Sequence, residues 1–195
     1  MNFELTKTQE LFRQMIREFA DREVKPLAAG IDEQERFPEE TVRKMGPLGI
    51  MGIPVPKEYG GAGGDNIMYS IAVEELSRVC GTTGVVVSAH TSLCVAPILE
   101  NGTPEQKAKY LPRLCSGEWI GAFGLTEPNA GTDAAGQQTT ALLEGNEWVL
   151  NGSKIFITNA GPAHVYVVMA MTDKSLGTKG ISAFIVESGT PGFSV

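Results

Sequence analysis

The hydrophobic pattern of this chain changes its period near Trp119, and that change most limits what the chain can fold into. Before Trp119, apolar residues recur three or four positions apart, which predicts amphipathic helices. After it, β-branched and aromatic runs alternate with turn residues, which predicts strands. We therefore expect an α+β, multi-domain chain of 195 residues, with an all-α helical domain over 1–118 and a mostly antiparallel β-domain over 119–195.

Start signals mark two of the expected helices. Thr6 with Gln9, and Thr103 with Gln106, have the spacing of a capping box, in which each side chain accepts the other residue's backbone N–H. The helix that begins after Thr6 is expected to end or bend at Pro26, because proline removes a helical hydrogen bond.

Glycine and proline divide the rest of the helical part. Pro38 is expected in the first turn of a helix that a Gly-Pro pair ends, and the glycine-rich run 60–64 is expected to be a loop. An apolar stripe over 67–79 predicts the next helix, and it leaves Glu74 and Glu75 on the opposite, solvated face.

The run 79–99 contains no charged residue and resembles a membrane span in its hydropathy. Glycine, proline and several hydroxyl residues interrupt it, so a buried helix is favoured and no membrane partner is expected. His90 within this run and His164 before an expected strand are too far apart to indicate a pair of metal ligands. Each is interpreted as a structural or surface residue, and no metal site is predicted.

Charge and cysteine content exclude some classes of function. The formal net charge of −7 argues against nucleic acid as a partner, because such binding depends on clustered cations. Cys80, Cys94 and Cys115 are odd in number and lack the spacing of metal ligands, which favours a reducing compartment. The first residues lack the pattern of a secretion signal, so we expect a cytoplasmic protein.

Six strands are expected after Trp119. The pair Asn151-Gly152 predicts a tight hairpin, since both residues tolerate positive φ. Residues 193–195 look like the start of a further strand without a partner, so the β-domain is expected to be incomplete. The expected strands are 119–125, 138–143, 147–150, 153–158, 165–171 and 181–186, of which 165–171 is apolar on both faces and suits the centre of the sheet.

One motif joins a strand to a turn. Residues 123–133 read Phe-Gly-Leu-Thr-Glu-Pro-Asn-Ala-Gly-Thr-Asp. Gly131 lets the backbone come close to a ligand, and Thr132 offers an N–H and a hydroxyl, so successive N–H groups of this turn suit a pyrophosphate. Taken alone, a strand that ends in an Asn/Gly turn is common and indicates no function.

A second motif, Lys154-Ile-Phe-Ile-Thr-Asn159, is expected to be extended. In a strand, Lys154, Phe156 and Thr158 share one face, so an aromatic ring and a hydroxyl point the same way. Such a pair can cover one face of an isoalloxazine ring and hydrogen-bond its edge. The alternative is a phenylalanine packed in a sheet beside a satisfied threonine.

Both motifs resemble the FAD-binding signatures of acyl-CoA dehydrogenases, and the resemblance covers the whole chain, including 72–78 and 179–184. It is nearest to butyryl-CoA (short-chain) dehydrogenases. It implies FAD-dependent α,β-desaturation of butyryl-CoA to crotonyl-CoA, with electrons passed to electron-transferring flavoprotein, by a homotetramer. The family's C-terminal helical bundle, which supplies a glutamate as catalytic base, is expected beyond Val195. No catalytic residue is therefore assigned, and the chain alone is expected to be inactive.

The resemblance also implies roles for single residues. The backbone of Leu125 and Thr126 and the Thr126 hydroxyl would serve the pyrimidine edge of the flavin. Gly131 and Thr132 would approach the pyrophosphate, and Thr132 would also touch the CoA thioester arm as a substrate contact. The complete set of implied flavin contacts is Phe123, Gly124, Leu125, Thr126, Gly131, Thr132, Phe156, Ile157 and Thr158.

In the second motif, Phe156 would pack on the ring face away from substrate, and Thr158 would hydrogen-bond near the nitrogen that accepts hydride. Many relatives carry Trp where this chain has Phe156, which implies a less shielded ring. Glu127 is a tempting base, but it belongs by motif to the cofactor turn, and a base must reach the α-proton in a bound pose.

Three alternatives remain open at this stage. The same site would serve an enoyl-CoA reductase that works in the opposite direction. A naturally short chain could instead be a non-catalytic module that binds CoA esters or docks on a partner. The third alternative is a related flavin monooxygenase, for which poor shielding from oxygen would be tolerable.

Overall fold

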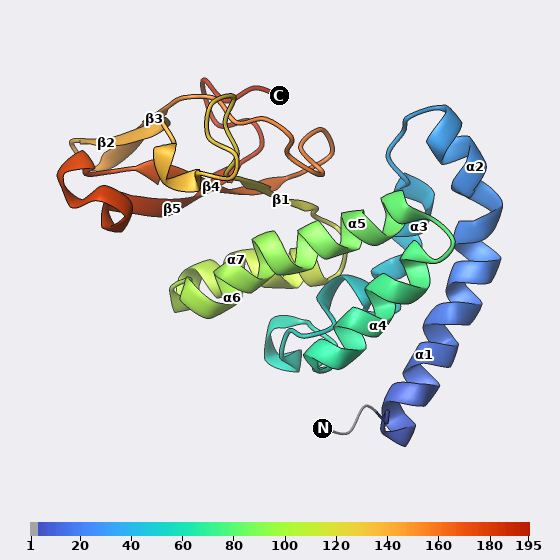
Figure 1. The fold of residues 1–195 in the computed structure, drawn as a ribbon. Coiled ribbons are helices and arrows are strands. Elements are labelled where there is room, and N and C mark those ends of the chain that lie inside the picture. The colour runs from blue at the N-terminus through green and yellow to red at the C-terminus, as the bar shows by residue number, and fades with distance from the viewer. Residues whose placement is uncertain (1–3) are drawn as a thin grey trace.

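The structure, a computed structural model, describes residues 4–195 as a helical part followed by a sheet (Figure 1). The expected α+β architecture is confirmed. The helices are α1 (Lys7–Phe19), α2 (Lys25–Glu33), α3 (Glu39–Met45), α4 (Asn66–Ser77), α5 (Gly81–Ala89), α6 (Ala96–Asn101) and α7 (Pro104–Cys115), and the strands are β1 (Gly121–Gly124), β2 (Thr140–Glu144), β3 (Glu147–Asn151), β4 (Val165–Met171) and β5 (Ile181–Glu187).

Both predicted capping boxes form. The Thr6 hydroxyl accepts the Gln9 N–H at the start of α1, and Thr103 with Gln106 repeats the arrangement at the start of α7. The helix does not end at Pro26 as expected: α1 runs to Phe19, a π-helical segment follows, and α2 continues with Pro26 in its first turn. The capping signals are local, so the sequence alone is enough to specify them.

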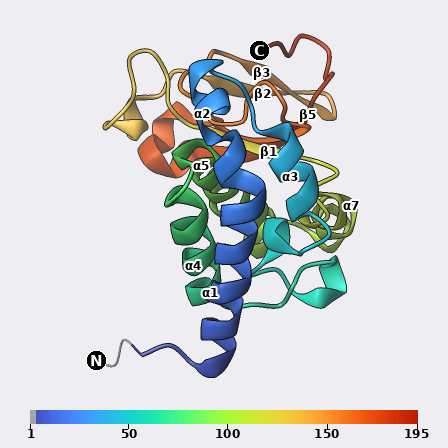
Figure 2. The same cartoon turned by 90° about the vertical axis from the view of Figure 1, so that its right-hand side faces the viewer.

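Two other expectations about the helical part are wrong in detail. Pro38 caps α3 from outside its first turn. Glu75 is not on a solvated face: only 1% of the residue is exposed, because α1 packs along α4 and covers it (Figure 2). Arg17 donates to Glu75 through two nitrogens at 2.7 and 2.9 Å. Arg78, three positions after Glu75, donates to the same carboxylate. The buried carboxylate is therefore paired, as burial of charge requires.

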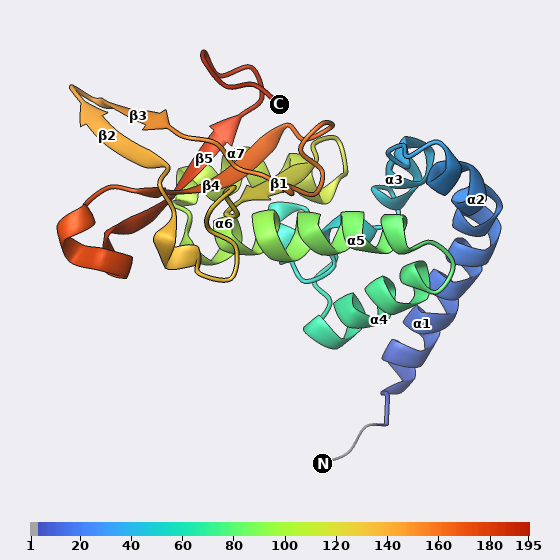
Figure 3. The ribbon, with the colours of Figure 1, turned by 45° about the horizontal axis from the view of Figure 1, so that its top comes forward.

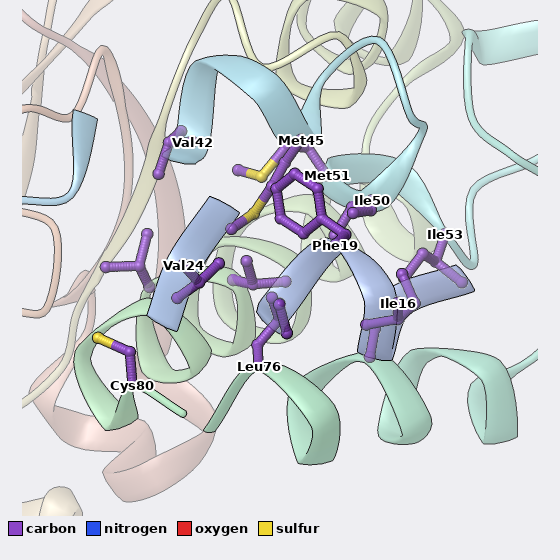
Figure 4. Close-up of a cluster of buried hydrophobic side chains, with 14 of the residues drawn as sticks. Ile16, Phe19, Val24, Val42, Met45, Ile50, Met51, Ile53, Leu76 and Cys80 are labelled. Carbon is purple, nitrogen blue, oxygen red and sulfur yellow. The ribbon is translucent and has the colours of Figure 1, made fainter. Parts of the chain in front are cut away.

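A hydrophobic core holds the helical part together. Figure 4 shows side chains from α1, the π-helical segment after it, α3, the following turn and α4 converging in one cluster. The labelled members are Ile16, Phe19, Val24, Val42, Met45, Ile50, Met51, Ile53, Leu76 and Cys80.

The uncharged run forms α5, a π-helical segment (His90–Val95) and α6. Among the described residues, Gly81–Asn101 is the one helix long and apolar enough to cross a membrane by length and composition. However, 56% of its 18-residue window is buried inside the protein, and it packs against α4 and β1. This burial supports the interpretation as a core helix.

The sheet has the strand order β1-β4-β2-β3, with β5 also paired to β4. β4 is buried along most of its length at the centre, as its apolar sequence predicts. Pairing is mixed: β2–β3 and β4–β5 are antiparallel over their whole lengths, whereas β1–β4 is parallel over four residues and β2 meets β4 in parallel at one position.

Three expectations about the sheet part are wrong. The tight hairpin turn is Gly145-Asn146 between β2 and β3, with Gly145 at φ 63°, and not Asn151-Gly152. Residues 153–158 are irregular, with a bend at Phe156, where φ is 58° and so outside the range of a strand. Residues 193–195 are outside any strand.

The first strand is anchored to the helical part at Gly121. A Cβ on Gly121 would stand 2.5 Å from Cys94 Sγ, so glycine is required by close approach. The Gly121 N–H donates to His90 Nδ1 at 3.0 Å. Burial lowers the pKa of His90 to about 4, which keeps the imidazole neutral and able to accept. The structural interpretation of His90 is confirmed.

Candidate functional site

The two predicted motifs lie side by side although twenty residues, 134–153, separate them in the sequence. The Ile155 N–H donates to the Thr126 carbonyl at 2.8 Å, and Lys154 Nζ donates to the Leu125 carbonyl at 3.0 Å. We call residues 123–133 the first wall and residues 154–159 the second wall. In Figure 3 the loop that carries the second wall, drawn in orange, runs beside β1 and above α5.

The first wall begins as regular structure. Phe123 and Gly124 pair with Val167 and Val168 of β4, and the half-buried Phe123 side chain packs on the hydrophobic cluster beneath the sheet. Thr126 lies beyond the strand, and its carbonyl oxygen accepts the Ile155 N–H. Within residues 4–195, neither its N–H nor its hydroxyl donates to another protein group.

The turn of the first wall leaves room beside its backbone. Glu127 and Ala130 close the turn with backbone hydrogen bonds of 3.0 and 3.1 Å. Gly131 has no left-handed backbone angle, and a Cβ there would meet no atom within 4 Å. The chain itself does not require glycine at this position, so the open space suits the close approach of a ligand. Thr132 is exposed beside it.

The second wall differs from its prediction. Phe156 and Asn159 both take left-handed angles, φ 58° and 68°, so the two-residue alternation that placed Phe156 and Thr158 on one face does not apply. Phe156 is 89% exposed. A strained backbone that presents a bare aromatic ring is an arrangement typical of ligand sites.

Ile157 and Thr158 line an open cleft of about 450 Å³ between the second wall and the helical part. Its other side is built from the end of α2, the residues that follow it and α5, including Arg36, Phe37 and Thr82. The structure therefore brings Thr158 to a cleft and leaves Phe156 outside it.

Asn159 fixes the second wall, and sequence reasoning gave it no role. Its side-chain nitrogen donates to the Val86 carbonyl at 3.1 Å and to the Gly121 carbonyl at 3.2 Å. These bonds tie the loop to α5 and to the base of β1. The tolerance of asparagine for positive φ is the one signal that the sequence offered.

A buried ion pair joins the two walls. Lys154 Nζ stands 2.7 Å from Glu127 Oε1, and these side chains are 10% and 6% exposed. Burial raises the pKa of Glu127, but hydrogen bonds from the Gln138 N–H, from Lys154 and from Thr139 outweigh it and hold the pKa at about 2. Glu127 is ionised with its oxygens engaged, so it is poorly suited to accept a proton.

Two family models match the chain. Residues 6–118 match the model described as acyl-CoA dehydrogenase, N-terminal domain, and residues 122–195 match acyl-CoA dehydrogenase, middle domain. Within the described residues, no group of three or more His, Cys, Asp or Glu side chains could hold a metal ion.

The chain is similar to proteins of known name. It is 68% identical over 195 residues to the short-chain specific acyl-CoA dehydrogenase of Clostridium acetobutylicum, covering 100% of this chain and 52% of that protein. The butyryl-CoA dehydrogenase structure from Megasphaera elsdenii matches with TM-score 0.94 and 46% identity, over 100% of this chain and 52% of that one.

A further structural match comes from work on the electron transferring flavoprotein of Acidaminococcus fermentans. That chain gives TM-score 0.96 and 52% identity, over 100% of this chain and 51% of its own length. The present chain thus spans about half the length of the relatives that it matches.

Proposed function

This chain belongs to the acyl-CoA dehydrogenase family, and from that premise we propose that the whole protein is an FAD-dependent oxidoreductase that desaturates short-chain acyl-CoA. Butyryl-CoA is the proposed substrate and crotonyl-CoA the product, with electrons passed to electron-transferring flavoprotein. The similarity to a short-chain specific dehydrogenase at 68% identity supports the substrate class. The observation that carries the proposal is the 2.8 Å hydrogen bond from the Ile155 N–H to the Thr126 carbonyl. This bond brings the two motifs together in one place.

The residues present fit FAD. The Thr126 N–H and hydroxyl would serve the pyrimidine edge, together with the Leu125 backbone, and the open backbone at Gly131 and Thr132 would hold the diphosphate. Thr132 would also contact the CoA arm. Bound FAD would supply the acceptor for hydride from the substrate β-carbon. The remaining proposed contacts are Phe123, Gly124, Phe156, Ile157 and Thr158.

The base that removes the α-proton is proposed to lie outside residues 4–195. Glu127, which follows the proposed contact Thr126, is already bound to Lys154 and to backbone N–H groups. We therefore propose that the 195-residue chain alone does not turn over butyryl-CoA.

The same proposal includes the domain boundary, the assembly and the location. α7 ends at Cys115 and β1 begins at Gly121, which supports a division between residues 118 and 119. The assembly proposed for the whole protein is a homotetramer. The three cysteines are buried and unpaired, which supports a reducing, cytoplasmic compartment.

The test is the anaerobic absorption spectrum of the full-length protein before and after butyryl-CoA is added. We expect a flavin spectrum that bleaches in the full-length protein and does not bleach in the 195-residue chain. A full-length protein without flavin that still binds butyryl-CoA would contradict the proposal and favour a CoA-ester binding module. A flavin that ignores butyryl-CoA but, once reduced, is reoxidised by crotonyl-CoA would favour a reductase.

A further inference from the structure

Lys154 is a cation held away from solvent between the two walls. Its ammonium group donates to three acceptors: the Leu125 carbonyl at 3.0 Å, Glu127 Oε1 at 2.7 Å and Gln137 Oε1 at 3.0 Å. An ammonium has three N–H groups, so this set uses all of them. The position of the charge is therefore fixed by the fold.

The surroundings of Lys154 are built to keep it there. Glu127 balances the charge and is itself held by the backbone N–H groups of Gln138 and Thr139. A Cβ on Gly124 would stand 3.3 Å from Lys154 Cγ, so the glycine of β1 leaves space for the lysine stem. A pair whose role is only to hold two loops together would not need the third acceptor, Leu125, which is a backbone carbonyl of the first wall.

The bond to Leu125 acts on a peptide group of the proposed flavin site. A charged donor at a carbonyl oxygen draws electron density toward it, and the N–H of the same peptide becomes a stronger donor. That N–H belongs to Thr126, whose own carbonyl is engaged by Ile155. The charge of Lys154 therefore polarises the Leu125–Thr126 peptide, whose N–H would serve the pyrimidine edge in the proposed site.

The direction of the effect follows from charge. A flavin gains electron density at its pyrimidine edge on reduction, and a stronger donor there stabilises the reduced form more than the oxidised form. Glu127 opposes this effect, but the backbone N–H groups of Gln138 and Thr139, which donate to Oε2 and Oε1, neutralise part of its charge. The cation of Lys154 is the charge bonded directly to the Leu125 carbonyl.

We propose that Lys154 is a positioning residue that raises the reduction potential of the flavin by polarising the Leu125–Thr126 peptide, an inference that rests on the proposed flavin site. It touches neither substrate nor the reacting atoms. Its proposed effect is on the reduction potential of the flavin, which can be measured without turnover.

The experiment measures the two-electron potential of the full-length protein loaded with FAD, by anaerobic titration against a reference dye. In Lys154→Met the apolar stem remains and the charge is lost, so the reduction equilibrium is expected to shift about tenfold toward the oxidised form, which is about 30 mV for two electrons. Glu127→Gln removes the opposing charge and is expected to shift the equilibrium the other way.

Lys109→Met is the matched control. Lys109 also pairs with a glutamate, Glu187, but on α7 at the surface, and its loss should leave the potential unchanged. Shifts of opposite sign in the potential for Lys154→Met and Glu127→Gln are the key result. If loss of the Lys154–Glu127 ion pair only loosened the contact between the walls, both variants would shift the potential in the same direction.

Several results overturn the inference. One is a Lys154→Met protein with full FAD content and the wild-type potential, and another is a shift of the same sign in both variants. If Lys154→Met does not retain FAD, the double variant Lys154→Met with Glu127→Gln removes both buried charges and must have a lower potential than Glu127→Gln alone; equal potentials overturn the inference. A wild-type full-length protein that holds no FAD is a distinct result, since it rejects the proposed function and this inference falls with it.

Discussion

The two walls of the proposed site are built by different means. The first wall starts as a strand in register with β4 and closes with a backbone turn, so backbone hydrogen bonds fix most of it. The second wall has no regular structure and two left-handed residues, and the side chains of Lys154 and Asn159 hold it in place. A wall that is specified by its backbone pattern can be predicted from sequence, whereas one specified by distant side-chain bonds cannot.

The largest expected effect is on the Lys154–Glu127 ion pair that joins the two walls. Glu127 has a pKa of about 2 in the folded state, against an ordinary value of 4.5. Its contribution of about 3 kcal/mol is therefore complete above pH 4.5 and is lost as the pH falls toward 2. Denaturant unfolding of full-length Glu127→Gln across this range should show a flatter acid limb than the wild type. If the stability of the variant and of the wild type changed with pH in parallel, the Lys154–Glu127 pair would contribute nothing to acid stability.

The next effect separates two glycines of the first wall region. Gly121→Ala places a Cβ 2.5 Å from Cys94 Sγ and should destabilise the protein by about 2–3 kcal/mol, as overpacking does. Gly131→Ala, its control, meets no atom within 4 Å and should change stability by less than about 0.5 kcal/mol while weakening FAD retention. Thermal unfolding and FAD release measure the two effects. Equal loss of stability in both variants would contradict the close contact at Gly121.

Asn159→Ala tests the second wall alone. It removes the hydrogen bonds to Val86 and Gly121 and leaves buried carbonyls without that donor, which should cost about 2 kcal/mol. Amide hydrogen exchange should accelerate over 157–162 and stay unchanged over β4. Asn101→Ala, which removes an exposed bond to Pro97, is the control and should be nearly neutral. Unchanged exchange over 157–162 would show that other contacts fix the loop.

The smallest effect has the opposite sign. Phe156→Gly relieves a left-handed angle that costs a bulky residue about 1 kcal/mol, so the FAD-free protein should gain roughly 0.5 kcal/mol after the entropy cost of glycine. The same variant loses the exposed ring and should release FAD faster. A variant that is more stable and retains FAD like the wild type would remove Phe156 from the proposed site.

Sequence reasoning succeeded where the signals are local. Thr6 and Thr103 cap helices through residues three positions away, and the apolar run of β4 fixes its place at the centre of the sheet. These features depend on neighbours in the chain, so pattern and propensity describe them well.

The errors have a common physical cause in contacts between distant segments. Glu75 is covered by α1 and paired with Arg17, nearly sixty positions earlier. Residues 153–158 have strand-like composition, but their bonds go to the first wall and to Gln137, and not to a neighbouring strand. Periodicity records which residues prefer burial or extension, and it does not record which partner will be near.

The pairing of β1 with β4 has a consequence for biosynthesis. Gly121 pairs with Val165, so more than forty residues must leave the ribosome after β1 before its strand partner exists. During that interval the finished helical part offers β1 a docking surface at His90 and Cys94. We therefore expect the helices to act as a template that protects an unpaired edge from aggregation while the rest of the sheet is still being translated.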